Sequence, residues 1–252
     1  MQDKIYWVIS VANMKQNPKQ TIVFILPNLL TSASIFSGVF SIISSIHHDF
    51  VQAAWLIVLA LVFDGLDGRV ARLTNSCSKF GVEFDSLADI VSFGVAPAVL
   101  IYVFAAEPYG RFGVVVTALY VIFGAIRLAR FNIMSASAEP SVFIGVPIPT
   151  AAVFLSLLVL LFHKYEAFSS GIALLVATII VALLMVSNIR YPSFKKIDFD
   201  KKDIRKIFIS LTLVLLLVFI YPIEGIVLLF SFYILYGPLR ALNTLLRKKS
   251  LH

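Results

Sequence analysis

The chain has 252 residues, of which 60% are hydrophobic and 14% are charged, and its formal net charge is +7. A typical soluble domain carries about 25% charged residues, so the composition excludes an ordinary water-soluble protein and indicates a polytopic helical membrane protein. The single cysteine, Cys77, excludes an intrachain disulfide and a cysteine-based metal site.

The N-terminal segment, residues 1–20, precedes the first long apolar block. We expect no cleavable signal peptide there, because no apolar stretch ends in small residues. Residues 4–14 form either a short interfacial helix, with Ile5, Trp7 and Val8 on its apolar side, or a frayed tail. Both interpretations leave this segment on the membrane surface rather than across it.

Apolar blocks of about 20 residues, the length of a helix that crosses a bilayer, follow along the rest of the chain. We predict eight spans, at residues 28–46, 51–73, 84–106, 113–134, 148–163, 167–188, 206–222 and 224–246. With these spans Lys and Arg gather on one side, and only Arg111 and Lys164 fall on the other.

This asymmetry predicts that both termini lie in the cytoplasm. We expect the membrane to be an inner or plasma membrane of bacterial type. The basic loop at 191–205 lies on the same side, where it either sets orientation alone or also holds anionic lipid head groups. The positive charge is thereby assigned to a membrane surface, and no nucleic-acid partner is expected.

Four acids lie at the cytoplasmic ends of the second and third spans: Asp64, Asp67, Asp85 and Asp89. A helix turns about 100° per residue, so the first two share one face and the last two share another. Small or basic residues lie on the same faces: Gly68, Ala71 and Arg72 on the first helix and Gly81 on the second. A short connection makes the two helices antiparallel neighbours, so the acidic faces can meet.

Four converging carboxylates repel one another and need compensation. Protonation is one solution and Arg72 could balance one charge, but divalent cations are more natural, because oxygen ligands suit Mg²⁺, Mn²⁺ or Ca²⁺. Gly68 and Ala71 would leave room for a ligand to approach the backbone. Metal ions beside an arginine suit phosphoryl chemistry, and a free carboxylate can take a proton from an incoming hydroxyl.

Two other functions remain open for the acids. One is a buried ion-pair network that only joins two helices. The other is the cation pathway of a transporter or channel, although such a pathway favours acids near the bilayer midplane on broken helices.

The eight residues from Asp64 to Asp89 fill the pattern D-x2-D-G-x2-A-R-x8-G-x3-D-x3-D without a mismatch. The pattern resembles the signature of the CDP-alcohol phosphatidyltransferase family. The resemblance implies an all-α membrane fold with a six-helix core, which we place at residues 21–190, and usually a homodimer. The last two spans, within residues 206–252, would be additions to that core.

The resemblance also implies a chemistry for individual residues. Two divalent cations, Mg²⁺ or Mn²⁺ with Ca²⁺ as a further option, would be held by Asp64, Asp67, Asp85 and Asp89. Asp89 would also be the general base, and CMP would leave from a CDP-activated lipid. The implied CDP-lipid site consists of Asn28, Thr31, Asp64, Gly68, Ala71, Arg72, Lys79 and Gly81. Asn28 has a second interpretation, as the N-cap of the first span after Pro27.

Further motifs are similar to the phosphatidylserine synthase branch of that family. They are Pro27-Asn28 with Thr31 and Gly38, and the runs DSLADIVSFGVAPA (85–98), RLARFN (127–132) and GVPIPTAA (145–152). They imply transfer of a phosphatidyl group from CDP-diacylglycerol to L-serine. Glycerol 3-phosphate or an inositol phosphate remains open as the acceptor, and an ether lipid remains open as the donor.

A serine acceptor requires a cation for its carboxylate. Arginine can bind a carboxylate through two parallel hydrogen bonds, so the acceptor candidates are Arg127 and Arg130, with Asn132 beside them. The two arginines could also be ordinary positive-inside residues.

Overall fold

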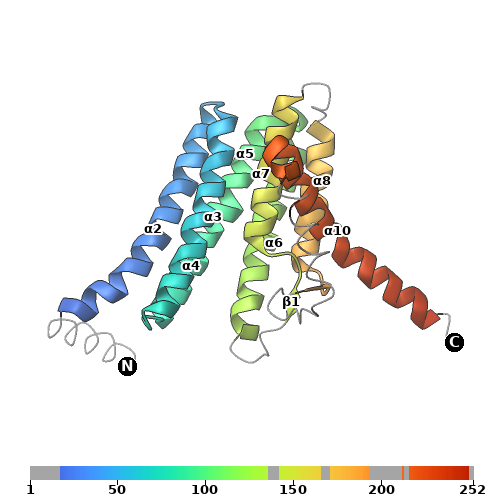
Figure 1. Cartoon of the computed structure of the whole chain (residues 1–252). Helices are drawn as coiled ribbons and strands as arrows, with labels where there is room; N and C mark the ends of the chain where they lie inside the picture. Colours follow the sequence, from blue (N-terminus) through green and yellow to red (C-terminus); the bar gives the residue numbers. More distant parts are fainter. Residues whose placement is uncertain (1–17, 136–141, 166–170, 193–211, 213–215, 250–252) are drawn as a thin grey trace.

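A computed structural model describes residues 18–135, 142–165, 171–192, 212 and 216–249. The chain forms a helical bundle (Figure 1). Its α-helices are α2 (Pro18–Ile46), α3 (Phe50–Leu73), α4 (Lys79–Asp89), α5 (Ala96–Ile101), α6 (Arg111–Ser135), α7 (Ile148–Lys164), α8 (Gly171–Val186) and α10 (Pro222–Lys249). Between α4 and α6 lie two π-helical segments, η1 (Ile90–Val95) and η2 (Tyr102–Ala106), and the 3-10 turn η3 (Glu107–Tyr109). One antiparallel strand pair joins β1 (Val142–Ile144) to β2 (Arg190–Pro192).

The described helices have the length and apolarity of membrane spans. Five stretches are long enough to cross a bilayer: Ile25–Ile46, Phe50–Leu73, Lys79–Tyr109, Arg111–Met134 and Pro222–Arg240. The helices α7 and α8 are shorter and also apolar. The chain is therefore an all-α integral membrane protein, as predicted, apart from the short strand pair. Most of the predicted span 206–222, most of the loop 191–205 and residues 1–17 lie outside the described residues.

Two helix starts differ from the sequence prediction. α2 begins at Pro18 and continues through Pro27, so Asn28 lies inside the helix and its interpretation as an N-cap is wrong. α4 begins at Lys79, five residues before the predicted start, because Ser78 caps its first turn. The extension of α4 is polar, whereas that of α2 contains the apolar residues 22–26 and is separated from the predicted span by Pro27, a residue type that usually ends or kinks a helix.

Small residues set the distance between α2 and its neighbours. The Ser34 hydroxyl donates to the Ala60 carbonyl of α3 at 3.2 Å. Gly38 faces η1 so closely that an added Cβ would lie 2.8 Å from the Ser92 Cα. Small residues at a helix contact let the two backbones approach in a membrane. Gly38 is therefore required by the close packing of α2 against η1.

The segment η1, which follows Asp89, is fixed to α6 by a buried hydroxyl. Pro97 has no N–H, so the carbonyl of Phe93, four residues earlier, lacks its usual helical donor. The Tyr120 hydroxyl of α6 donates to that carbonyl at 2.9 Å, and Tyr120 is fully buried. The widened turn η1 follows Asp89 directly, and such π-segments are frequent at functional sites.

Candidate active site

The structure brings the predicted acids together between α3 and α4. Carboxylate oxygens of Asp64, Asp67 and Asp85 all lie within 4.8 Å of one another. The Asp64 carboxyl also interacts with the carboxyls of Asp85 and Asp89. In Figure 1 the turn between α3 and α4 lies at the same end of the bundle as the start of α2 and the end of α10. The acids therefore gather toward one membrane surface.

These four carboxylates lack ion-pair partners among the described residues. The Oδ1 atoms of Asp85 and Asp89 are buried without a hydrogen-bond partner, and Asp89 is only 9% exposed. Burying an uncompensated charge in an apolar environment is costly. Converging, unpartnered carboxylate oxygens are the donor set that a hard divalent cation fits.

Thr31 orients one of the acids from the neighbouring helix. Its hydroxyl donates to Asp67 Oδ2 at 2.6 Å, and both residues are buried. The hydroxyl also lies 3.1 Å from the Pro27 carbonyl of its own helix. Thr31 thus fixes the direction in which the second Asp67 oxygen points.

A cavity of about 200 Å³ opens beside the acids. Its lining includes Asp67 and Asp85 together with six of the eight residues predicted for the CDP-lipid site: Asn28, Thr31, Gly68, Ala71, Arg72 and Gly81. Asp64 and Lys79, the other two, do not line it. A Cβ added at Gly68 would find only an Arg72 guanidinium nitrogen within 4.0 Å, so this glycine keeps the cavity open.

The turn between α3 and α4 adds lining residues that sequence reasoning missed: Ser76, Cys77 and Ser78. The Ser78 hydroxyl accepts a hydrogen bond from the Gly81 amide at 3.0 Å and so caps α4. A Cβ at Gly81 would lie 3.2 Å from that hydroxyl oxygen. A serine shortly before a helix is a recognisable capping pattern, and it could have identified Ser78.

The cation that interacts electrostatically with Asp89 is Arg127 rather than Arg72. Arg72 is exposed and forms no ion pair with the described acids. Arg127 is 6% exposed and interacts electrostatically with Asp89. Its guanidinium carbon lies 5.1 Å from the Phe131 ring centroid, and its Nε has no hydrogen-bond partner. One buried arginine therefore faces the acids from α6.

Arg130 has different surroundings although it lies one turn further along α6. Its guanidinium donates five hydrogen bonds of 3.0–3.3 Å, four to main-chain carbonyls and one to a side-chain amide: Ile144, Met185, Val186, Ser187 and Asn188. The last carbonyls of a helix have no partner within the helix, and Arg130 supplies donors for the end of α8. It joins α6 to α8 and β1.

Asn132 lies beside the acidic helix. Its side-chain amide donates to the Ser86 hydroxyl at 2.8 Å, and Ser86 follows Asp85 on α4. Asn132 therefore links the end of α6 to α4 rather than pointing away from the acids.

A family model described as CDP-alcohol phosphatidyltransferase matches residues 24–186, which contain the four aspartates, the cavity and Arg127. Over 219 residues the chain is 50% identical to a CDP-diacylglycerol–serine O-phosphatidyltransferase of Helicobacter pylori, covering 86% of this chain and 91% of that relative. It is 40% identical over 181 residues to an archaetidylserine synthase of Methanothermobacter thermautotrophicus, covering 71% and 74%. It is 37% identical over 171 residues to a CDP-diacylglycerol–serine O-phosphatidyltransferase of Bacillus subtilis, covering 68% and 92%.

Proposed function

Since the chain belongs to the CDP-alcohol phosphatidyltransferase family, we propose that it transfers the phosphatidyl group of CDP-diacylglycerol to the hydroxyl of L-serine. The products are phosphatidylserine and CMP. One observation carries the proposal: Asp64, Asp67 and Asp85 converge without ion-pair partners among the described residues, and the last two line a cavity between α2, α3 and α4. The names of the Helicobacter and Bacillus relatives support serine as the acceptor.

The cavity receives the cytidine diphosphate end of the donor lipid, and the acyl chains stay in the bilayer. Gly68, Ala71 and Gly81 give the head group access to the backbone. Arg72 is exposed at the cavity, where its guanidinium can bind a phosphate oxygen.

The four aspartates hold two divalent cations, Mg²⁺ or Mn²⁺, in this proposal. When bound, such ions neutralise the carboxylates and stabilise charge on the diphosphate and on the departing CMP. Thr31 supports the arrangement, because its hydrogen bond leaves one Asp67 oxygen in a fixed direction. The buried, unpartnered oxygens of Asp85 and Asp89 are consistent with that donor set.

Asp89 is the proposed general base. As the serine oxygen attacks the phosphorus that carries diacylglycerol, a new P–O bond forms and the proton passes to Asp89. The P–O bond to CMP breaks, and CMP leaves with the bonding electron pair. Arg127 binds the serine carboxylate, which places the serine hydroxyl next to Asp89 because only two carbons separate the two groups. The electrostatic interaction between Arg127 and Asp89 supports this placement.

Arg130 is left out of the proposed acceptor site, because its donors are occupied by the end of α8. Asn132 stays close to the proposed acceptor site, because it donates to Ser86 on α4. We also infer, from the distribution of Lys and Arg, that the site and both termini face the cytoplasm. The homodimer implied by the family belongs to the same proposal.

The test is CMP release by the purified protein with CDP-diacylglycerol and Mn²⁺ or Mg²⁺, with acceptors supplied one at a time. We expect release with L-serine. Release only with glycerol 3-phosphate would keep the acid chemistry and overturn the assignment of Arg127. If no alcohol supports CMP release and the protein instead carries cations across proteoliposome membranes, the proposal that it acts as an enzyme is wrong.

An ether-lipid donor is the second candidate, because one relative is named an archaetidylserine synthase. Supplying the CDP-activated diether lipid beside CDP-diacylglycerol decides between them. A higher kcat/KM with the diether lipid would reverse the choice of donor.

A further inference from the structure

The widened turn η1 continues directly from the helix that carries the proposed base. Asp89 is the last residue of α4, and η1 begins at the next residue with no loop between them. The backbone at Asp89 stays helical, with φ −56° and ψ −43°. Any rotation of η1 about its axis is therefore passed on to the Asp89 side chain.

η1 is wider than an α-helical turn. The Ala96 amide at its end donates to the Val91 carbonyl, five residues earlier rather than four. Each residue of an α-helix adds about 100° of rotation, so closing η1 into α-turns would rotate Asp89 by roughly that angle relative to α5. The face of the helix on which Asp89 lies thus depends on η1 staying wide.

Two hydroxyl groups hold η1 against neighbouring helices. The Tyr120 hydroxyl of α6 donates to the Phe93 carbonyl at 2.9 Å, and the Ser92 hydroxyl donates to the Ser34 carbonyl of α2 at 2.9 Å. All four residues are buried. The Ser34 carbonyl lies inside a continuous helix, whereas the Phe93 carbonyl faces the missing N–H of Pro97. The bond from Tyr120 is therefore the one that η1 requires.

The same bond relates Asp89 to the proposed acceptor residue. Tyr120 and Arg127 are seven residues apart on α6, so they lie on one face, about 10 Å apart along the helix. Asp89 lies about 6 Å before Phe93 along its own helix. Because these two consecutive spans run in opposite directions, both displacements lead toward the same membrane surface. The contact between Tyr120 and Phe93 thus sets the rotation and height of Asp89 relative to Arg127.

We propose that η1 sets the direction of Asp89 and that Tyr120 is the positioning residue that keeps this turn wide. This inference rests on the proposed function, in which Asp89 takes the proton of the serine hydroxyl. A backbone N–H at position 97 would draw the Phe93 carbonyl into an ordinary α-turn. The phenol from α6 satisfies that carbonyl without closing the turn, and a base must lie within hydrogen-bond reach of the proton it removes.

The test compares Tyr120→Phe with Thr117→Val, a control that removes another buried hydroxyl from α6. The Thr117 hydroxyl bonds to carbonyls of its own helix, those of Gly113 and Val114. For Tyr120→Phe we expect kcat with L-serine to fall by about 10–50-fold, because a small displacement of a catalytic group is costly. The KM for CDP-diacylglycerol stays within about twofold, since Tyr120 does not line the donor cavity. Thr117→Val changes neither constant.

A double substitution shows whether Tyr120 acts through Asp89. If it does, adding Tyr120→Phe to Asp89→Asn lowers kcat little further. A merely structural role would lower kcat equally in both backgrounds, and that result would overturn the inference. A wild-type kcat in Tyr120→Phe would also overturn it, while serine transfer stands. A wild-type protein that releases CMP with no alcohol would overturn the proposed function first.

If Tyr120→Phe does not fold, Ser92→Ala tests the same turn from the side of α2. It removes the bond to the Ser34 carbonyl, which keeps its place in the helical ladder of α2. We expect kcat to fall by about 3–10-fold, with the KM for CDP-diacylglycerol unchanged. A wild-type kcat in this variant would then overturn the role of η1.

Discussion

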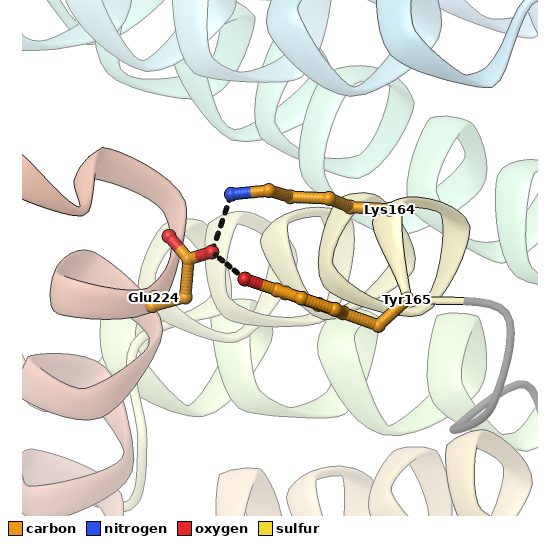
Figure 2. Close-up of polar contacts among 3 residues, drawn as sticks. All are labelled: Lys164, Tyr165 and Glu224. Atoms are coloured by element: carbon orange, nitrogen blue, oxygen red, sulfur yellow. Dashed lines mark hydrogen bonds and ion pairs between the residues drawn. The ribbon is translucent and has the colours of Figure 1, made fainter.

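The acidic side chains at the two ends of the helical bundle differ in their ion-pair partners. Toward one end, Glu224 shares a single oxygen with the Lys164 ammonium and the Tyr165 hydroxyl (Figure 2). Toward the other, four aspartates meet without an ion pair among the described residues, and two of their oxygens are buried without a hydrogen-bond partner. Glu224 has a lysine in ion-pair contact, whereas the four aspartates have, from the cations among the described residues, only the electrostatic interaction between Asp89 and Arg127.

This difference separates a structural charge from a functional one. Glu224 forms an ion pair that joins α7 to α10, although its Oε2, like the Oδ1 atoms of Asp85 and Asp89, is buried without a hydrogen-bond partner. Converging carboxylates without ion-pair partners cost stability until a cation binds them, as the proposed function requires. The comparison predicts that replacing an acid by its amide strongly lowers CMP release at the aspartate end and leaves it almost unchanged at the Glu224 end.

The largest effect is expected for Asp89→Asn. The amide keeps the size of the side chain but cannot accept a proton, so CMP release with L-serine falls by about a thousandfold. The melting temperature stays equal or rises, because one of four repelling charges is gone. Activity and thermal unfolding of the same preparation check both statements. Activity within tenfold of wild type would remove Asp89 from the role of base.

The next effect sharpens the contrast between two arginines one turn apart. Arg127→Lys loses the bidentate geometry for a carboxylate, and we expect the KM for L-serine to rise by about 30–100-fold with little change in melting temperature. Arg130→Lys loses several bonds to carbonyls at the end of α8, and we expect a stability loss of about 1–3 kcal/mol. Its KM for L-serine should stay near the wild-type value.

Steady-state kinetics and thermal unfolding of both variants are the measurement. A reversed pattern, with the serine effect in Arg130→Lys, would move the acceptor site to the α6–α8 contact.

A smaller effect concerns Cys77, the only cysteine of the chain. It is exposed and lines the cavity with Arg72 and Asp85. Bound CDP-diacylglycerol should slow its alkylation by a maleimide about threefold or more, because the head group covers the thiol. L-serine alone should not slow it. Equal labelling rates with and without CDP-diacylglycerol would place the donor head group elsewhere.

The smallest effect is expected for Glu224→Gln at the opposite end. The Lys164–Glu224 pair is partly exposed, and exposed pairs contribute little to stability. We expect a melting temperature within a few degrees of wild type and CMP release within about twofold at saturating serine. A complete loss of CMP release would contradict the division between a structural and a functional end. Thermal unfolding followed by circular dichroism and the CMP-release assay are the measurements.

Much of this organisation is predictable from the sequence. Apolar blocks of about 20 residues must become helices in a bilayer, because lipid offers no partners for backbone groups. The spacing of Asp64, Asp67, Asp85 and Asp89 fixes their helix faces, since side chains three or four residues apart lie on one side of a helix. The strands β1 and β2 are three residues long, α4 begins in polar residues, and α2 continues through Pro27, so apolar length does not reveal their bounds.

What the tertiary structure alone decides is which charges are paired. Arg127 and Arg130 have the same chemistry, the same helix and the same predicted side of the membrane, yet one faces Asp89 and the other holds the end of α8. Thr31 of α2 donates to Asp67 of α3 across 36 residues of sequence, which no local spacing could indicate. Local periodicity determines the direction of a side chain from its own helix. The packing of distant helices determines what it meets there.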